Sequence, residues 1–152
     1  MMVRNYLLLL LTLSVAIVLS LAVFGRARAA HEYLEEDYQA AFCAPRGGDM
    51  EYLLDDRSRV DCLFADVDGA RIALEVDFGK KRDEGLGQAM RYGADTGLTP
   101  GVLLILEHPG DAKYLGQLQR AARYWGLPLR VWTMTPDDLR NPPQGAPGVR
   151  HE

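Results

Sequence analysis

Cysteine and histidine are scarce in this chain of 152 residues, which holds only two cysteines and three histidines. A structural zinc site usually takes about four cysteine and histidine ligands at close, regular spacing. No such spacing occurs here, and this argues against a zinc-type centre. The residues concerned are Cys43, Cys62, His31, His108 and His151.

The chain after residue 30 also lacks an excess of positive charge. It holds all 21 acidic residues against 14 basic ones, a net charge of about −7. Proteins that bind nucleic acids usually neutralise phosphates with lysine and arginine. The overall charge therefore argues against a general nucleic-acid binder. A local basic stripe could override it, and the candidates are Lys80, Lys81, Arg82 and Arg91.

Charged residues are absent from the 19 positions between Tyr6 and Phe24, which form one apolar run. This length favours a membrane-spanning anchor, since a spanning helix needs about 20 residues and the apolar core of a signal peptide has about 7–15. Ala27-Arg28-Ala29, however, fits the small-residue pattern of a signal-peptide cleavage site. We therefore expect residues 1–29 to be a signal peptide or an N-terminal transmembrane anchor that contacts the membrane through residues 6–24.

Either alternative places the folded domain outside the cytoplasm, as a periplasmic, secreted or membrane-anchored protein. In such an oxidising compartment a Cys43–Cys62 disulfide is chemically stable. The other interpretation is a pair of buried thiols. The sequence leaves both open.

The stretch from Arg59 to Tyr92 gathers more functional side chains than any other part of the chain. Val60–Ala65 and Arg71–Phe78 are predicted strands joined by a turn at Asp68-Gly69. A helix is predicted from Asp83 to Tyr92. The sequence therefore predicts a hairpin that leads directly into a helix.

Five side chains of this stretch are expected to converge. Because alternate residues of a strand face the same way, Glu75 and Asp77 project together, and Asp61 can lie across from them on the neighbouring strand. Gln88 and Tyr92 are four residues apart and share one face of the helix. That face can turn toward the three carboxylates.

This layout resembles the PD-(D/E)XK nuclease superfamily. The motif of that superfamily has an Asp on one strand, an acidic residue followed two positions later by Lys on the next strand, and often a QxxxY helix. Asp61, Glu75, Gln88 and Tyr92 match these positions. The resemblance implies a metal-dependent nuclease that hydrolyses phosphodiester bonds in DNA or RNA.

The resemblance also implies roles for individual residues. Asp61 and Glu75 would hold Mg²⁺ or Mn²⁺, which activates water and offsets phosphate charge. A glutamate of the preceding helix often joins such a site, and Glu35 is the candidate here, although a solvated acidic helix face is the simpler interpretation.

The chain departs from the motif at the lysine, because that position is occupied by Asp77. Lys80 and Lys81 lie three and four residues further on; Lys80 could reach back to replace the missing lysine, and Lys81 is the next candidate. In the structural alternative, Asp77 caps the following turn and Glu75 pairs with a local cation. A separate alternative is a catalytically inactive nuclease-fold module that has lost the motif lysine and has a binding or structural role in the cell envelope.

The remaining elements are predicted from periodicity. They are a helix over 31–42, a short strand over 51–54, a strand over 102–106, a helix over 111–126 and a strand over 127–132. In the last strand we expect Leu129 and Val131 to face inward and Arg130 and Trp132 to face outward.

The order of these elements predicts the α/β class. It agrees with a restriction-endonuclease-like fold, a mixed sheet flanked by helices with an αβββαβ core plus an extra helix and strand. We expect this domain to span residues 30–135. The Pro- and Gly-rich residues 136–152 are expected to form a disordered tail.

Overall fold

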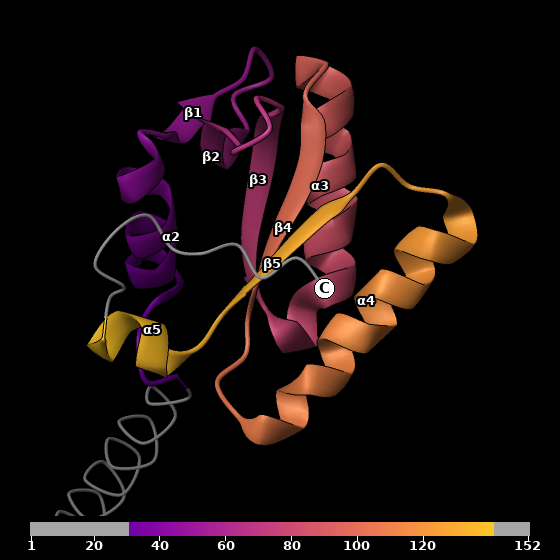
Figure 1. Ribbon diagram of the computed structural model, residues 1–152. Helices are drawn as coiled ribbons and strands as arrows, with labels where there is room; N and C mark the ends of the chain where they lie inside the picture. Colours follow the sequence, from indigo (N-terminus) through magenta and orange to yellow (C-terminus); the bar gives the residue numbers. More distant parts are fainter. Residues whose placement is uncertain (1–30, 142–152) are drawn as a thin grey trace, which may run out of the picture. The chain divides into compact units, whose positions relative to one another are not determined.

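The computed structural model of the protein describes residues 31–141, in which strands and helices alternate along the chain (Figure 1). The strands are β1 (Asp49–Leu53), β2 (Arg59–Ala65), β3 (Arg71–Phe78), β4 (Thr99–Ile105) and β5 (Arg130–Met134). The helices are α2 (Glu35–Cys43), α3 (Arg82–Thr96), α4 (Ala112–Trp125) and α5 (Pro136–Arg140), with short 3₁₀ turns η1 (Ala44–Arg46), η2 (Gly79–Lys81) and η3 (Pro109–Asp111).

The apolar segment expected to contact a membrane, residues 6–24, lies outside the described residues, and so does the expected cleavage site. Within residues 31–141 no helix is long and apolar enough to cross a membrane. The described residues from Tyr33 onward belong to one compact unit.

The strands form one five-stranded sheet in the order β1-β2-β3-β4-β5. β1, β2 and β3 are antiparallel neighbours, whereas β3, β4 and β5 pair in parallel. Parallel neighbours need a crossover connection, and the helices α3 and α4 supply the two crossovers. The predicted α/β class with a mixed sheet is therefore confirmed.

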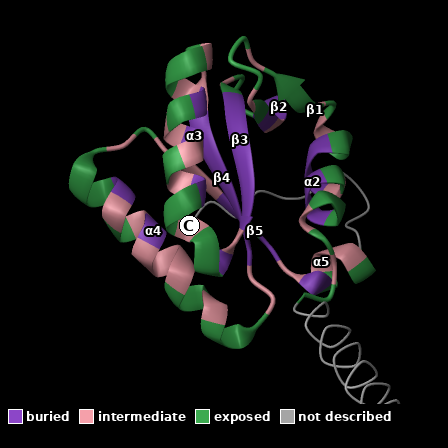
Figure 2. Cartoon of the chain, turned by 180° about the vertical axis from the view of Figure 1, so that it is seen from behind, coloured by how far each residue is buried: buried purple, intermediate pink, exposed green. Residues whose placement is uncertain are grey.

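Helices cover both faces of this sheet. α2 packs on β2 and β3 and also contacts α5, while α3 packs on β3 and β4 and contacts α4. In Figure 2 the central strands β3 and β4 are coloured as buried, and the outer surfaces of α3 and α4 as exposed. Because β3 is covered on both faces, its alternating side chains enter two different cores, with Leu74 in one and Ala73 in the other.

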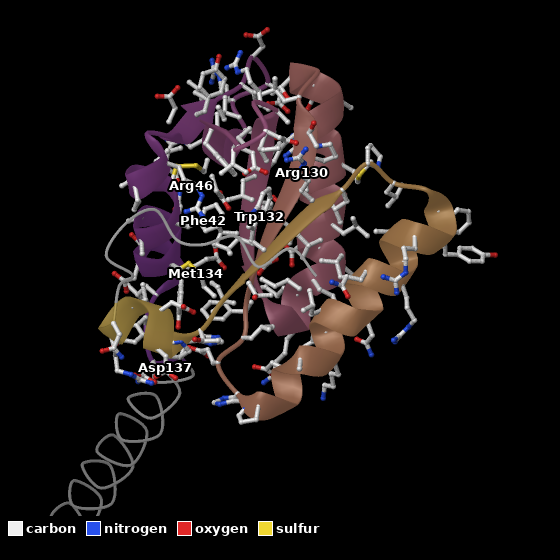
Figure 3. All side chains as sticks on the ribbon, viewed as in Figure 1. Phe42, Arg46, Arg130, Trp132, Met134 and Asp137 are labelled. Atoms are coloured by element: carbon white, nitrogen blue, oxygen red, sulfur yellow. A yellow bond between two sulfur atoms is a disulfide. The ribbon has the colours of Figure 1, made fainter. Side chains whose placement is uncertain are left out.

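The prediction that Trp132 faces outward is wrong. Trp132 is 5% exposed, and its ring centroid lies 5.7 Å from that of Phe42 and 5.5 Å from that of Phe64. Figure 3 shows Trp132 and Met134 of β5 on the same side of the sheet as Phe42 of α2. On the other face Val131 is partly buried against a second core and Thr133 is exposed, so Trp132 and Met134 form the more deeply buried face of β5.

The helix predicted over 83–92 is longer in the structure. η2 turns the chain after β3, and α3 then runs from Arg82 to Thr96. Gly97 ends the helix with a left-handed φ of 69°, which glycine adopts without the steric cost of a side chain. The helix therefore extends a full turn beyond Tyr92.

The expected boundary of the disordered tail at residue 136 is placed too early, because Pro136–Arg140 forms α5. Asp138 Oδ2 accepts hydrogen bonds from the Thr135 backbone N–H at 2.7 Å and from the Thr135 hydroxyl at 2.8 Å. This cap, with Pro136 in the first turn, stabilises the start of a short helix. The tail from residue 142 lies outside the described residues.

Candidate functional site

The central strands bring the three carboxylates of the sequence motif together. Cys62 pairs with Leu74 across β2 and β3, which places Asp61 beside Glu75. Asp61 Oδ2 accepts a hydrogen bond of 2.7 Å from the backbone N–H of Val76. Glu75 and Asp77 are only 6% and 2% exposed, so the hairpin carries two carboxyl groups into the interior.

Asp61 and Glu75 are joined through a proton. Burial, together with the charges of Asp61 and Asp77, raises the pKa of Glu75 to about 9. Burial also raises the pKa of Asp61, although less, because the Val76 N–H donates to the Asp61 carboxylate. Glu75 therefore keeps its proton at neutral pH and donates it to Asp61.

One oxygen of this pair remains unsatisfied. Glu75 Oε2 is buried and has no hydrogen-bond partner among the described residues. A buried oxygen without a partner is costly, and such groups often mark a functional site.

Asp77 forms an ion pair with Lys81. Lys81 Nζ lies 3.7 Å from Asp77 Oδ1, with the lysine side chain 56% exposed and the aspartate side chain 3% exposed. Burial raises the pKa of Asp77 to about 7, even though the positive charge of Lys81 acts to lower it. Lys80, preferred from the sequence, is exposed and forms no ion pair within the described part of the chain.

Gly85 lets α3 approach this ion pair. A Cβ atom at Gly85 would lie 3.2 Å from the Asp77 Cβ atom, which is closer than ordinary van der Waals contact. A residue with a side chain would push the helix away from β3. The glycine thereby fixes the distance between α3 and Asp77.

The Gln88 and Tyr92 pair reaches the carboxylates from α3. The Tyr92 hydroxyl donates a hydrogen bond of 3.3 Å to Gln88 Oε1. Burial, together with the neighbouring Glu75 carboxyl group, raises the pKa of Tyr92 to about 12. The helix face predicted from the QxxxY spacing therefore borders the site.

Glu35, the first residue of α2, lies close enough to act on the site through its charge. Its carboxylate contributes to the raised pKa values of Asp61, Glu75 and Asp77. Glu35 therefore belongs to the electrostatic surroundings of the three carboxylates.

Gln39 is a site residue that the sequence analysis missed. It is 8% exposed, and its Nε2 atom donates hydrogen bonds to the Asp61 backbone oxygen at 2.7 Å and to Glu51 Oε1 at 2.9 Å. Glu35, Gln39 and Cys43 follow one another at intervals of four on α2. This spacing puts them on one helix face, and it was the signal that could have identified Gln39.

The end of that helix face is covalently fixed. Cys43 and Cys62 form a disulfide, which is one of the two alternatives that the sequence left open. Both cysteines are fully buried. Since Cys62 follows Asp61, the bond ties α2 to the strand that carries the first carboxylate.

The predicted basic stripe is only partly present. The Arg91 guanidinium pairs with Asp56 Oδ2 at 3.1 Å and donates to Ser58, both in the turn between β1 and β2. Arg91 lies about 14 Å along α3 from Arg82. It therefore does not join the cations near the start of that helix.

The donor set fits part of a magnesium site. No group of three or more His, Cys, Asp and Glu residues within residues 31–141 is arranged to hold a metal ion. Mg²⁺, however, is commonly bound by one or two carboxylates, with water and substrate phosphate completing the coordination. Asp61 and Glu75, with the unsatisfied Glu75 oxygen, match this smaller requirement.

Comparison with protein-family models, with curated proteins and with solved structures finds no match for this chain. The resemblance to PD-(D/E)XK nucleases therefore rests on the site residues and on the order of the elements.

Proposed function

We propose that the protein is a metal-dependent nuclease that hydrolyses phosphodiester bonds in DNA or RNA, on a restriction-endonuclease-like fold. The observation that carries the proposal is the pair of half-buried Asp61 and buried Glu75, whose carboxyl groups share a proton and leave one Glu75 oxygen unsatisfied. The αβββαβ order of the elements supports the fold.

In this proposal Asp61 and Glu75 hold Mg²⁺ or Mn²⁺. The bound metal supplies charge stabilisation to the phosphate and lowers the pKa of water. Glu75 must lose its proton to become a metal ligand, so metal binding competes with protonation of this site. Tyr92, whose hydroxyl donates to Gln88, borders the Glu75 carboxyl from α3.

The Asp77 and Lys81 ion pair takes over the role of the motif lysine. Asp77 has a pKa of about 7, which suits a group that accepts a proton from water near neutral pH. Lys81 supplies the positive charge next to it. The pair thus offers the acceptor and the cation for which the motif uses one lysine.

We further propose that the domain works outside the cytoplasm. The Cys43–Cys62 disulfide is compatible with this location, because disulfides persist in oxidising compartments. The apolar run between Tyr6 and Phe24 supplies the export signal or anchor in this proposal.

The experiment is a cleavage assay on plasmid DNA, single-stranded DNA and RNA with Mg²⁺ or Mn²⁺. We expect the wild type to cleave at least one substrate and Asp61→Asn and Glu75→Gln to lose activity. Asp55→Asn is the matched control, because Asp55 is an exposed carboxylate in the turn between β1 and β2. Equal activity in Asp61→Asn and in the wild type would refute the proposed site.

A second candidate is the inactive nuclease-fold module, with a binding or structural role in the cell envelope. The observation that favours it is the aspartate at the position of the motif lysine. It predicts no cleavage of any substrate and no Mn²⁺ binding that depends on Asp61. Calorimetric titration of the wild type and of Asp61→Ala with Mn²⁺ separates the two functions.

A further inference from the structure

Two cations from different helices lie close to the aromatic ring of Tyr114. The guanidinium carbon of Arg82, at the start of α3, lies 5.3 Å from the centroid of the Tyr114 ring. Lys113 Nζ, from the first turn of α4, lies 4.8 Å from the same centroid. The ring face attracts cations, so Tyr114 contacts two positive charges that come from different helices.

The chain between β3 and α3 brings two more cations to this place. A Cβ atom at Gly79 would lie 2.8 Å from Cδ2 of the Tyr114 ring, so only glycine allows η2 to pack this closely against α4. Lys80 and Lys81 follow directly in η2. We call Lys80, Lys81, Arg82 and Lys113, with Tyr114 between them, the basic cluster.

The basic cluster adjoins the carboxylate site. Lys81 belongs to both, through its ion pair with Asp77. In Figure 1, α3 and α4 both begin near the lower end of the sheet, where β3 and β4 end. Helix N-termini carry partial positive charge and unpaired backbone N–H groups, which adds to the field of the four side chains.

Acidic neighbours neutralise only part of this charge. Arg82 pairs with Asp83 at 3.1 Å. Lys81 pairs with Asp77, and the negative charge of Glu84 also acts on Lys81. The Asp111 carboxylate accepts a hydrogen bond from the backbone N–H of His108 and so caps η3. Lys80 and Lys113 form no ion pair within the described residues.

One donor of the basic cluster is also unused. Arg82 Nε is buried and has no hydrogen-bond partner among the described residues. The exposed amino groups of Lys80 and Lys113 are suited to phosphate, which accepts several hydrogen bonds at once.

We propose that the basic cluster binds the phosphodiester backbone of a nucleic-acid strand and leads it to the carboxylate site. The substrate class rests on the proposed nuclease function. The domain as a whole is acidic, so a nucleic acid cannot be held by overall charge and needs such a local surface. Arg82 and Lys113 are held by the Tyr114 ring, which reduces the entropy lost on binding.

The test measures binding separately from cleavage. Fluorescence anisotropy with the full chain, in EDTA, uses a labelled single-stranded oligonucleotide and a labelled duplex. We expect Lys80→Ala and Lys113→Ala each to weaken affinity by about fivefold to tenfold at 0.1 M salt and to reduce the salt slope by about one. Arg123→Ala should leave affinity unchanged, because Arg123 is an exposed cation of α4 about 15 Å along the helix from Lys113.

A further variant and a competitor sharpen the test. Tyr114→Leu should weaken binding as Lys113→Ala does, because the ring holds both cations. Equal losses in Arg123→Ala and Lys113→Ala would overturn the proposal, since they would show only a general charge effect. Equal competition by polyglutamate at matched charge would also overturn it, by showing a site for acidic protein.

The two proposals fail in different ways. If the wild type cleaves nucleic acid but Lys80→Ala and Lys113→Ala bind as the wild type does, the basic cluster proposal is wrong and the nuclease proposal stands. If binding depends on the basic cluster and no substrate is cleaved, the nuclease proposal is wrong and the basic cluster proposal stands.

Discussion

Lys81 Nζ lies 3.7 Å from Asp77 Oδ1, so a buried aspartate is paired with an exposed lysine four residues later. The motif would put the lysine itself at the position of Asp77. Here the positive charge reaches the same place from the turn after the strand. Of the two lysines that the sequence offered, the structure favours Lys81 over Lys80 for this role.

The first prediction therefore concerns these two lysines. Lys81→Ala should reduce cleavage by about 10²–10⁴-fold at saturating substrate, the usual size of an electrostatic or acid–base role. Lys80→Ala, the matched control, should weaken substrate binding but leave the maximal rate close to that of the wild type. Steady-state kinetics of both variants provides the measurement. Loss of the maximal rate in Lys80→Ala alone would restore the original preference for Lys80.

The second prediction is a pH dependence of stability without metal. Folding raises the pKa of Glu75 to about 9 and that of Asp77 to about 7, against about 4 in an unfolded chain. A raised pKa means that the folded protein binds more protons. The resulting stabilisation is complete below pH 4 and is lost as pH rises through about 7 to 9.

We therefore expect the free energy of unfolding in EDTA to fall between about pH 4 and pH 9, by up to about 1.4 kcal/mol per pH unit for each proton released. Urea titrations at a series of pH values measure this slope. Glu75→Gln with Asp77→Asn should flatten it. A wild-type stability that rises over the same range would contradict the buried, protonated carboxyl groups.

The third prediction compares two glycines of α3. Gly87→Ala should stabilise the protein by about 0.5–1 kcal/mol, because nothing lies within 4 Å of the added Cβ and alanine favours a helix. Gly85→Ala should lose this gain, since its Cβ would lie 3.2 Å from Asp77 Cβ. Thermal unfolding measures both, and Mn²⁺ titration of Gly85→Ala shows whether the site moves. Equal gains in both variants would mean that Gly85 does not set the distance between α3 and β3.

The fourth prediction concerns the disulfide. The Cys43–Cys62 bond closes a loop with a sequence separation of 19 residues, for which chain entropy gives a stabilisation of about 3 kcal/mol. Unfolding in urea with and without a reductant measures it on an unchanged sequence. The double variant Cys43→Ala with Cys62→Ala should not respond to the reductant. The same stability in reduced and oxidised wild type would show that the bond contributes nothing.

The sequence predicted the order of the elements up to β5 because apolar residues follow the helical or strand period there. It failed at Trp132 because alternation does not say which face of a strand is buried: Trp132 and Met134 face the core, whereas Val131 is partly buried and Thr133 is exposed. α5 was missed because proline and glycine dominate the residues around it. Thr135 and Asp138, three residues apart, form a capping pair that could have predicted its start.

Only those parts of the site that follow the periodicity of a strand or a helix could be predicted from the sequence. Alternation placed Glu75 and Asp77 on one face, and a four-residue spacing joined Gln88 to Tyr92. The 3₁₀ turn η2 decides which lysine pairs with Asp77. No periodic pattern in the sequence predicts where this turn begins. Arg91 was wrongly predicted to belong to the basic stripe. It pairs instead with Asp56, a residue far away in the sequence, and no local pattern predicts that contact.

The hairpin and the helix α3 bring together nearly all of the candidate site from one continuous segment, between Asp61 and Tyr92. Contacts between residues that are near in sequence close short loops and form quickly. The carboxylates can thus meet before β4 and β5 join the sheet. Most of the candidate chemistry is thus carried by one segment of sequence, which a protein designer could move as a unit, provided that the new scaffold supplies a helix in the place of α2.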